Sequence, residues 1–203
     1  MTHTVNFRRA SRAEAAALHR LIAANLEAGH LLPRSLEDLE QHAHRFIVAE
    51  DGGEIVGCGE LAPLGDSVAE IRSLVVQERY RGRHIGSDLV QQIADAATAA
   101  GFSTLCAFTH EPTPFVRLGF SIVPHVWVPE KVARDCTACA LFRRCGQYAV
   151  TRALRAGVPL RPQQPAAVIY AGRAAAPRKP NVERLQLRAT GHARSDRKEP
   201  IPA

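Results

Sequence analysis

The sequence predicts an α/β fold in which helices flank a mixed, mostly antiparallel sheet. Runs of β-branched residues alternate along the chain with stretches whose apolar residues recur at helical spacing. Of the 203 residues, 46% are hydrophobic and 23% are charged, which is enough to bury a core. From about residue 159 prolines recur and apolar periodicity fades. We therefore expect a domain over residues 1–158 and a Pro/Arg-rich, largely disordered tail over residues 159–203.

The N-terminal part of the chain predicts one strand and two helices. Residues 5–9 are expected to form the strand. The first helix, residues 11–29, starts at a capping box in which Ser11 and Glu14 bond free N–H groups. A second helix is expected over residues 35–44, after an arginine-bearing loop. We expect the two helices and this loop to form a lid on the substrate side.

The rest of the domain predicts most of the sheet. Two consecutive glycines favour a tight reversal between strands at residues 45–50 and 54–61. Gly101 is suited to end a long helix, because glycine readily adopts the left-handed conformation found there. The other expected elements are strands at 68–76, 103–109, 122–123 and 147–154, a helix ending at 101, and a helical turn at 114–120.

The central feature is the strand at residues 70–76, which leads into a basic, glycine-bearing loop and the start of a helix. The first N–H groups of a helix lack intrahelical partners and carry partial positive charge, so they attract anions. Arginines add full charges, and glycines let a ligand approach the backbone. The stretch is neither a Walker loop nor a GxGxxG fingerprint. The residues expected to cradle a pyrophosphate are Arg81, Gly82, Arg83, His84, Ile85, Gly86 and Ser87.

This junction resembles the acetyl-CoA loop of the GNAT family of N-acetyltransferases, which reads Gln/Arg-x-x-Gly-x-Gly/Ala between a strand and a helix. Arg81 and Gly86 match that pattern, and His84 stands where its first glycine usually lies. The resemblance implies the acetyltransferase fold, with acetyl-CoA as cosubstrate. The resemblance also implies a role for the backbone amides of Leu74, Val75 and Val76, if strand pairing is interrupted at these residues. These amides would then hold the pantetheine arm and polarise the acetyl carbonyl.

Acetyl transfer to an amine needs a group that takes the ammonium proton and one that protonates the leaving thiolate. Glu70 begins the central strand, where the resemblance places the general base of histone-type members; Glu60 and Glu111 are alternatives, as is a chain of waters. Many members use a tyrosine acid four residues before the glycine of a Leu-Gly-Phe turn. That position is Phe115 here, within the implied cofactor site. A phenyl ring donates no proton, so the thiolate must be protonated by water or another group, or leave unassisted.

Two arginines are candidates for binding an acceptor. A guanidinium can grip a carboxylate with two parallel hydrogen bonds, which suits an amino-acid substrate. Arg34 lies in the loop before the second predicted helix, and Arg72 lies in the central strand. Alternation along a strand should place Arg72 on one sheet face with Glu70 and Leu74. Alternatively, both arginines are ordinary surface charges.

Three of the five cysteines form a C-x2-C-x5-C cluster at Cys136, Cys139 and Cys145. Such spacing can hold Zn²⁺ if a fourth ligand such as His125 or Asp135 is near, or it can form a redox pair. We slightly favour the third interpretation, in which three partly buried cysteines lie in a connecting loop. The other two cysteines fall in predicted strands and are expected in the core.

A narrower resemblance covers roughly residues 5–154. The segments at 31–37, 70–74 and 129–132, together with the cysteine cluster, are similar to short, single-domain amino-acid N-acetyltransferases of arginine biosynthesis. Those N-acetylglutamate synthases acetylate the α-amino group of L-glutamate. The resemblance implies that Arg34 and Arg72 receive the glutamate carboxylates and that Glu70 manages the amine proton. Homodimers are common among such proteins.

Composition limits the alternatives. No run of eighteen apolar residues and no signal peptide is found, so we expect a cytoplasmic protein without a membrane partner. Residues 160–203 contain 9 Lys/Arg and 3 Asp/Glu, so the net charge of +6 resides in the tail. One alternative is an acetyltransferase for another small amine or a protein amino group. Another is a non-catalytic module that binds nucleic acid or another polyanion through its tail.

Overall fold

The computed structural model describes residues 5–26 and 31–158, and the fold that follows is that of these residues. The expected tail, residues 159–203, lies outside the described part of the chain, as does the predicted end of the first helix. Among the described helices, none is long and apolar enough to cross a membrane.

Seven strands form one sheet in the order β1-β2-β3-β4-β5-β7-β6. Every neighbouring pair is antiparallel except β4 and β5, which are parallel. The predicted mixed, mostly antiparallel sheet is therefore confirmed. The strands are β1 (Asn6–Arg9), β2 (Phe46–Asp51), β3 (Glu54–Pro63), β4 (Val68–Val76), β5 (Thr104–Thr109), β6 (Ser121–Val123) and β7 (Tyr148–Ala153).

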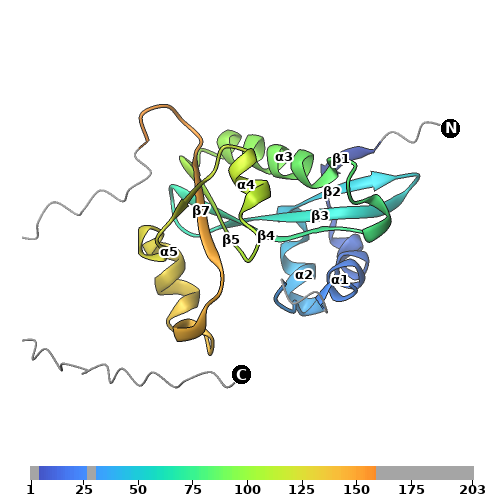
Figure 1. The fold of residues 1–203 in the computed structure, drawn as a ribbon. Helices are drawn as coiled ribbons and strands as arrows, with labels where there is room; N and C mark the ends of the chain where they lie inside the picture. Colours follow the sequence, from blue (N-terminus) through green and yellow to red (C-terminus); the bar gives the residue numbers. More distant parts are fainter. Residues whose placement is uncertain (1–4, 27–30, 159–203) are drawn as a thin grey trace, which may run out of the picture. The chain divides into compact units, whose positions relative to one another are not determined.

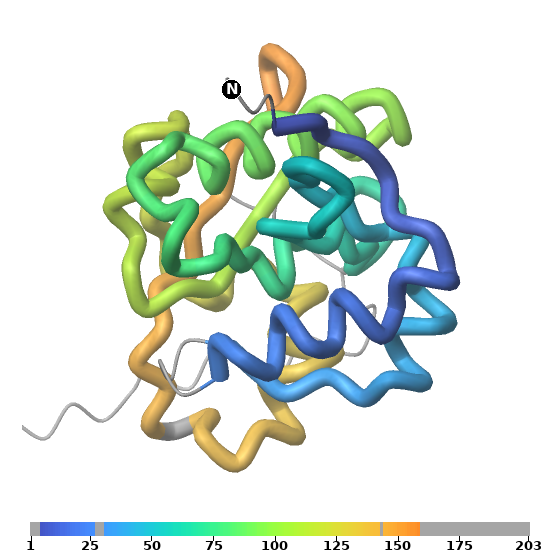
Figure 2. The backbone as a smooth tube through the Cα atoms, turned by 90° about the vertical axis from the view of Figure 1, so that its right-hand side faces the viewer, coloured from blue at the N-terminus to red at the C-terminus, as the bar shows by residue number. Residues whose placement is uncertain are grey.

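Helices lie on both faces of this sheet (Figures 1 and 2). The longest helix, α3, covers one face, and α1 and α2 cover the other; α5 lies on the side of α1 and α2. The α2 helix begins where predicted, because the Ser35 hydroxyl caps it by accepting the Asp38 N–H. The helices are α1 (Ala15–Ala23), α2 (Leu36–His42), α3 (Ile85–Ala99), α4 (Thr113–Arg117) and α5 (Pro129–Lys131).

Two predictions of local structure were wrong. The first α-helix, expected to run to about residue 29, ends at Ala23; residues 24–25 form a turn and residue 26 is in 3-10 conformation. The cysteine segment, expected as a connecting loop, contains the π-helix η6 (Val132–Cys136) and a 3-10 turn, η7 (Phe142–Arg144). Elements this short contain too few residues to show a helical period in the sequence.

The β4 strand contains a bulge that decides which side chains face which helices. Its register against β3 shifts by one residue between the Gly57–Cys58 end and Glu60, and Ser73 has a φ of 49°. An extra residue reverses the alternation of side chains. Ile71 and Leu74 therefore both pack in the apolar cluster under α3, whereas Val75 packs under α1 and α2. The expectation that Leu74 shares a face with Arg72 was wrong for this reason.

Candidate active site

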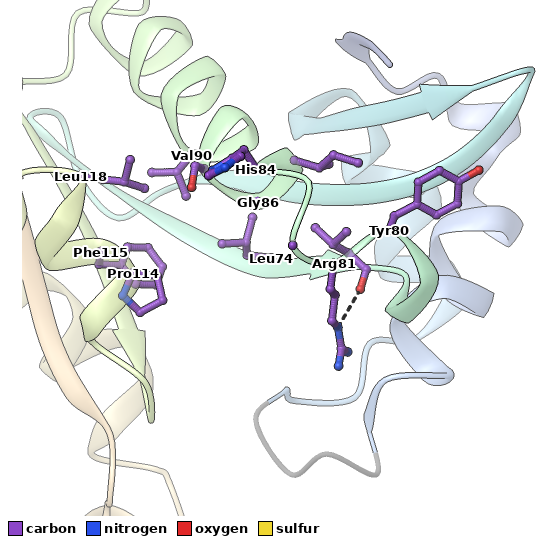
Figure 3. A pocket seen from close by; sticks show the side chains of 13 residues that line it. Leu74, Tyr80, Arg81, His84, Gly86, Val90, Pro114, Phe115 and Leu118 are labelled. Carbon is purple, nitrogen blue, oxygen red and sulfur yellow. Dashed lines mark hydrogen bonds between the residues drawn. The ribbon is translucent and has the colours of Figure 1, made fainter. Parts of the chain in front are cut away.

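A pocket of about 310 Å³ opens where β4, the following loop, the start of α3 and α4 meet (Figure 3). Pro114, Phe115 and Leu118 line one side, and Tyr80 and Arg81 lie across from them (Figure 3). The lining residues are Leu74, Val76, Tyr80, Arg81, Gly82, His84, Ile85, Gly86, Ser87, Val90, Pro114, Phe115 and Leu118. The loop and helix start singled out from the sequence thus form one wall of a real pocket.

Two residues expected at the cofactor lie outside this lining. Val75 is turned to the opposite face by the bulge, and Arg83 stacks on Tyr80, with its guanidinium 5.0 Å from the ring centre. Sequence reasoning missed Val90, Pro114 and Leu118 as lining residues. They come from the second turn of α3 and from α4, so only tertiary packing brings them to the pocket.

The start of α3 presents backbone donors to the pocket. Its first helical hydrogen bond runs from the Asp88 N–H to the His84 carbonyl, so the N–H groups of residues 85–87 precede the helical ladder. His84, which replaces the usual glycine, adopts a left-handed φ of 63°, and Gly82 has a φ of 77°. Histidine is among the residues that tolerate this conformation best after glycine. The loop therefore keeps a glycine-like backbone despite the substitution.

The bulge at Ser73 interrupts strand pairing beside the pocket, which is the condition under which the amides of residues 74–76 were expected to face a ligand. On its other side, β4 pairs with β5 only over Val68–Ile71, so the strands no longer pair along residues 72–76. Gly59 lies opposite the bulge, and a Cβ there would come within 2.7 Å of the Ile93 side chain and 3.2 Å of Leu74. The glycine allows α3 and the bulged strand to approach closely. Backbone amides at Leu74 and beyond can thus face a ligand.

Across the sheet from this pocket, four charged side chains form a closed ring of ion pairs. The Glu70 carboxylate, 4% exposed, accepts hydrogen bonds from Arg72 Nε at 2.5 Å and from Lys131 Nζ at 2.8 Å. The same two cations also bind Asp135. Burial opposes the charge on Asp135, but the hydrogen bond from Lys131 keeps the pKa of Asp135 below its usual range. Glu70 and Arg72 share a face, as predicted.

A second ion-pair group lies beside the bulge. Arg34 Nη1 donates to Glu60 Oε2 at 2.6 Å and to the Ser73 hydroxyl at 3.2 Å, and Arg34 Nε donates to Asp38 at 2.6 Å. Burial opposes the charge on Arg34, but the hydrogen bonds and charges of Glu60 and Asp38 together outweigh burial, so the pKa of Arg34 is raised. Glu60 is 2% exposed, and on β3 it lies directly opposite Arg72 of β4. Both predicted acceptor arginines therefore flank the bulge on one sheet face.

The remaining candidates lie in less favourable places. Phe115 lines the pocket and makes an edge contact with Phe120, with ring centres 5.3 Å apart. The Tyr80 hydroxyl donates to Asp51 rather than into the pocket, and this bond raises the pKa of Tyr80. Glu111 is exposed and accepts a bond from the Thr113 hydroxyl.

The cysteines show no metal geometry in the described part of the chain. Within that part, no group of three His, Cys, Asp or Glu side chains is placed to hold a metal ion. Cys136, Cys139 and Cys145 therefore do not form a metal site there. Cys139 and Cys145 are exposed, and burial raises the pKa of Cys136. Cys58 and Cys106 lie in the core as predicted, and burial raises the pKa of Cys58 to about 12.

A bulged strand beside a helix start that presents free N–H groups to a pocket is a site suited to a phosphate-bearing cofactor. Residues 15–120 match the model of the acetyltransferase (GNAT) family. A Chlorobaculum tepidum protein named as an N-acetyltransferase is 32% identical over 72% of this chain and 95% of its own length. The chain belongs to the GNAT family, is an acetyltransferase, and uses acetyl-CoA as cosubstrate.

Other relatives are larger proteins. The amino-acid acetyltransferase of Shewanella oneidensis is 35% identical over 61% of this chain, but the match spans only 28% of that relative. The N-acetylglutamate synthase of Neisseria gonorrhoeae, solved with coenzyme A and N-acetyl-glutamate, superposes with a TM-score of 0.68 at 27% identity. That match covers 76% of this chain and 36% of the synthase chain. The chain thus spans about a third or less of these relatives.

Proposed function

We propose that the protein acetylates the α-amino group of L-glutamate. The observation that carries this proposal is the placement of Arg34 and Arg72 on either side of the bulge at Ser73, on the face away from the cofactor pocket. Two guanidinium groups at that point suit an acceptor with carboxylates. The names of the larger relatives, which match in part, point to the same acceptor class.

The chemistry divides between the two faces of β4. The helix start and loop bind the diphosphate of the cosubstrate, and the amides beyond the bulge polarise the acetyl carbonyl. On the other face, the acceptor nitrogen gives up a proton to Glu70, directly or through water, and attacks the carbonyl carbon. The new C–N bond forms and the C–S bond breaks. The nitrogen gives up its second proton to solvent, and the thiolate takes a proton from solvent, since Phe115 has none to give.

The test is thiol release from acetyl-CoA by the purified full chain. L-glutamate is compared with L-aspartate, L-glutamine, L-lysine and spermidine, in the parent protein and in Arg72→Ala. Arg152→Ala is the matched control, because Arg152 hydrogen-bonds Gln91 at 3.2 Å on the outer part of β7. Turnover selective for glutamate, lost in Arg72→Ala and kept in Arg152→Ala, supports the proposal. Turnover with another amine alone moves the acceptor to the alternative class.

We further propose that residues 1–158 form the catalytic domain, and that the protein is cytoplasmic and a homodimer. A separate proposal is that residues 159–203, which lie outside the described residues, bind a polyanion. Salt-dependent binding of nucleic acid by the full chain, abolished on truncation after residue 158, would support it.

A further inference from the structure

Two cations converge on a single oxygen atom at the edge of the proposed acceptor site. Arg72 Nη2 donates to Asp135 Oδ2 at 2.5 Å, and Lys131 Nζ donates to the same oxygen at 2.8 Å. A guanidinium and an ammonium that share one carboxylate oxygen form a site built for a carboxylate. In the protein without acceptor, Asp135 supplies that carboxylate itself.

The two cations are held in place without Asp135. Lys131 Nζ also bonds Glu70 at 2.8 Å and lies 5.3 Å from the centre of the Phe108 ring. Arg72 Nε bonds Glu70 at 2.5 Å. The Glu70 side chain is only 4% exposed, so it anchors both cations from the inside of the site. Removing Asp135 therefore leaves two positioned cations with one unfilled carboxylate place.

Asp135 is the outermost member of the ring. Its side chain is 33% exposed, against 24% for Arg72, 13% for Lys131 and 4% for Glu70. It belongs to the π-helix η6, whose residues contribute nothing to the buried apolar clusters. Single π-turns are rare in proteins, and those that occur are frequently found at functional sites. A side chain in this position can turn into solvent without opening the core.

We propose that Asp135 stands in for the side-chain carboxylate of the acceptor and is displaced when the acceptor binds between Arg72 and Lys131. This inference rests on the proposed function and adds Lys131 to its acceptor site. With Asp135 turned out, Glu70, Arg72 and Lys131 carry a net charge of +1, which one carboxylate neutralises. A cationic acceptor gains nothing there, so the exchange selects for acceptors that carry a side-chain carboxylate.

The first experiment compares acceptor kinetics in Asp135→Asn, Lys131→Met and a matched control, Glu130→Gln. Glu130 is half-buried and next to Lys131, and it is outside the ring. Asp135→Asn should lower the KM for L-glutamate by about fivefold with kcat retained, because the internal competitor loses its charge. Lys131→Met should reduce the preference for L-glutamate over L-glutamine about tenfold. Glu130→Gln should change neither quantity.

A second measurement does not require turnover. Glutarate, a dicarboxylate without an amino group, should raise the midpoint of thermal unfolding of the full chain, at lower concentration in Asp135→Asn and at higher concentration in Lys131→Met. This pattern without acetylation of glutamate would refute the proposed function but support the carboxylate site. A raised KM and weaker glutarate protection in Asp135→Asn would instead make Asp135 a structural brace and overturn the inference.

Discussion

The buried ion pair between Arg34 and Glu60 offers the most informative test of how the acceptor face is stabilised. The Arg34 side chain is 15% exposed and that of Glu60 is 3% exposed, at 2.6 Å. Replacing Arg34 by Met leaves the Glu60 charge buried without its hydrogen-bonded partner. Breaking a buried pair from one side typically costs about 3–5 kcal/mol. Arg72 also interacts with Glu60, so a second cation still offsets the Glu60 charge in the variant. We therefore expect a loss of stability near the lower end of this range, about 3 kcal/mol.

The double variant Arg34→Met, Glu60→Gln should be more stable than Arg34→Met alone, because no charge is left buried and unpaired. The lost contact between Arg34 and Asp38 adds little, since Asp38 is 38% exposed. For a chain of this size, a loss of about 3 kcal/mol lowers the unfolding midpoint by about 6–12 °C. Urea and thermal unfolding of the parent protein and the two variants measure these differences.

The matched control is the pair Arg79–Glu54, which is also 2.6 Å apart but has side chains 62% and 51% exposed. Its removal should change stability much less, because water and salt already screen it. Equal losses for the buried and exposed pairs would contradict the role assigned to burial. So would a double variant no more stable than Arg34→Met.

Four further changes test other parts of the structure. Phe115→Tyr, at a pocket residue 8% exposed, should raise kcat by up to about 10²-fold, because it adds a proton donor; an unchanged kcat in steady-state assays would oppose this. His84→Val should be about 1–2 kcal/mol less stable in urea than His84→Gly, because φ is 63°. Gly59→Ala should raise the KM for acetyl-CoA by pushing on the pocket residue Leu74. The hydrogen bond from Arg8 lowers the pKa of Glu14 to about 2, below its ordinary 4.5. The pair therefore stabilises the fold fully above pH 4.5, and this stabilisation is lost as the pH falls toward 2. In Arg8→Met, acid unfolding should lack this pH-dependent loss of stability.

Local signals made the start of α2, the hairpin and the cofactor loop predictable. The capping at Ser35, the glycines of the hairpin and the loop before α3 each act within a few residues, so their patterns are visible in one sequence. His84 adopts the left-handed conformation that glycine favours, and the loop lines the pocket despite this departure from the family pattern. The local chemistry of a loop is enough to locate a helix start that presents free N–H groups to a pocket.

The acceptor side was only partly predictable. Arg34 and Arg72 were singled out, and Glu70 was considered as a partner of Arg72. The bond of Arg34 to Glu60 and that of Lys131 to Glu70 were not predicted, because Lys131 bonds Glu70 across 61 residues of sequence. The turn of Leu74 to the other face depends on the bulge, which involves a close approach of Gly59 to α3. Side-chain alternation assumes an unbroken strand, so it fails at a one-residue insertion.

The short parallel pairing of β4 with β5 affects how firmly the two parts of the sheet are joined. Only Val68–Ile71 pairs with Thr104–Ala107, so few backbone hydrogen bonds join the two parts of the sheet. The apolar cluster under α3 spans both parts, since it includes Ile71 on β4 and Val150 on β7. Side-chain packing in this cluster therefore adds to the short strand ladder in holding β5, β7 and β6 to the rest. A cosubstrate bound at the start of that helix would tie the two parts together, and the amides of β5 and β7 should then exchange hydrogen more slowly.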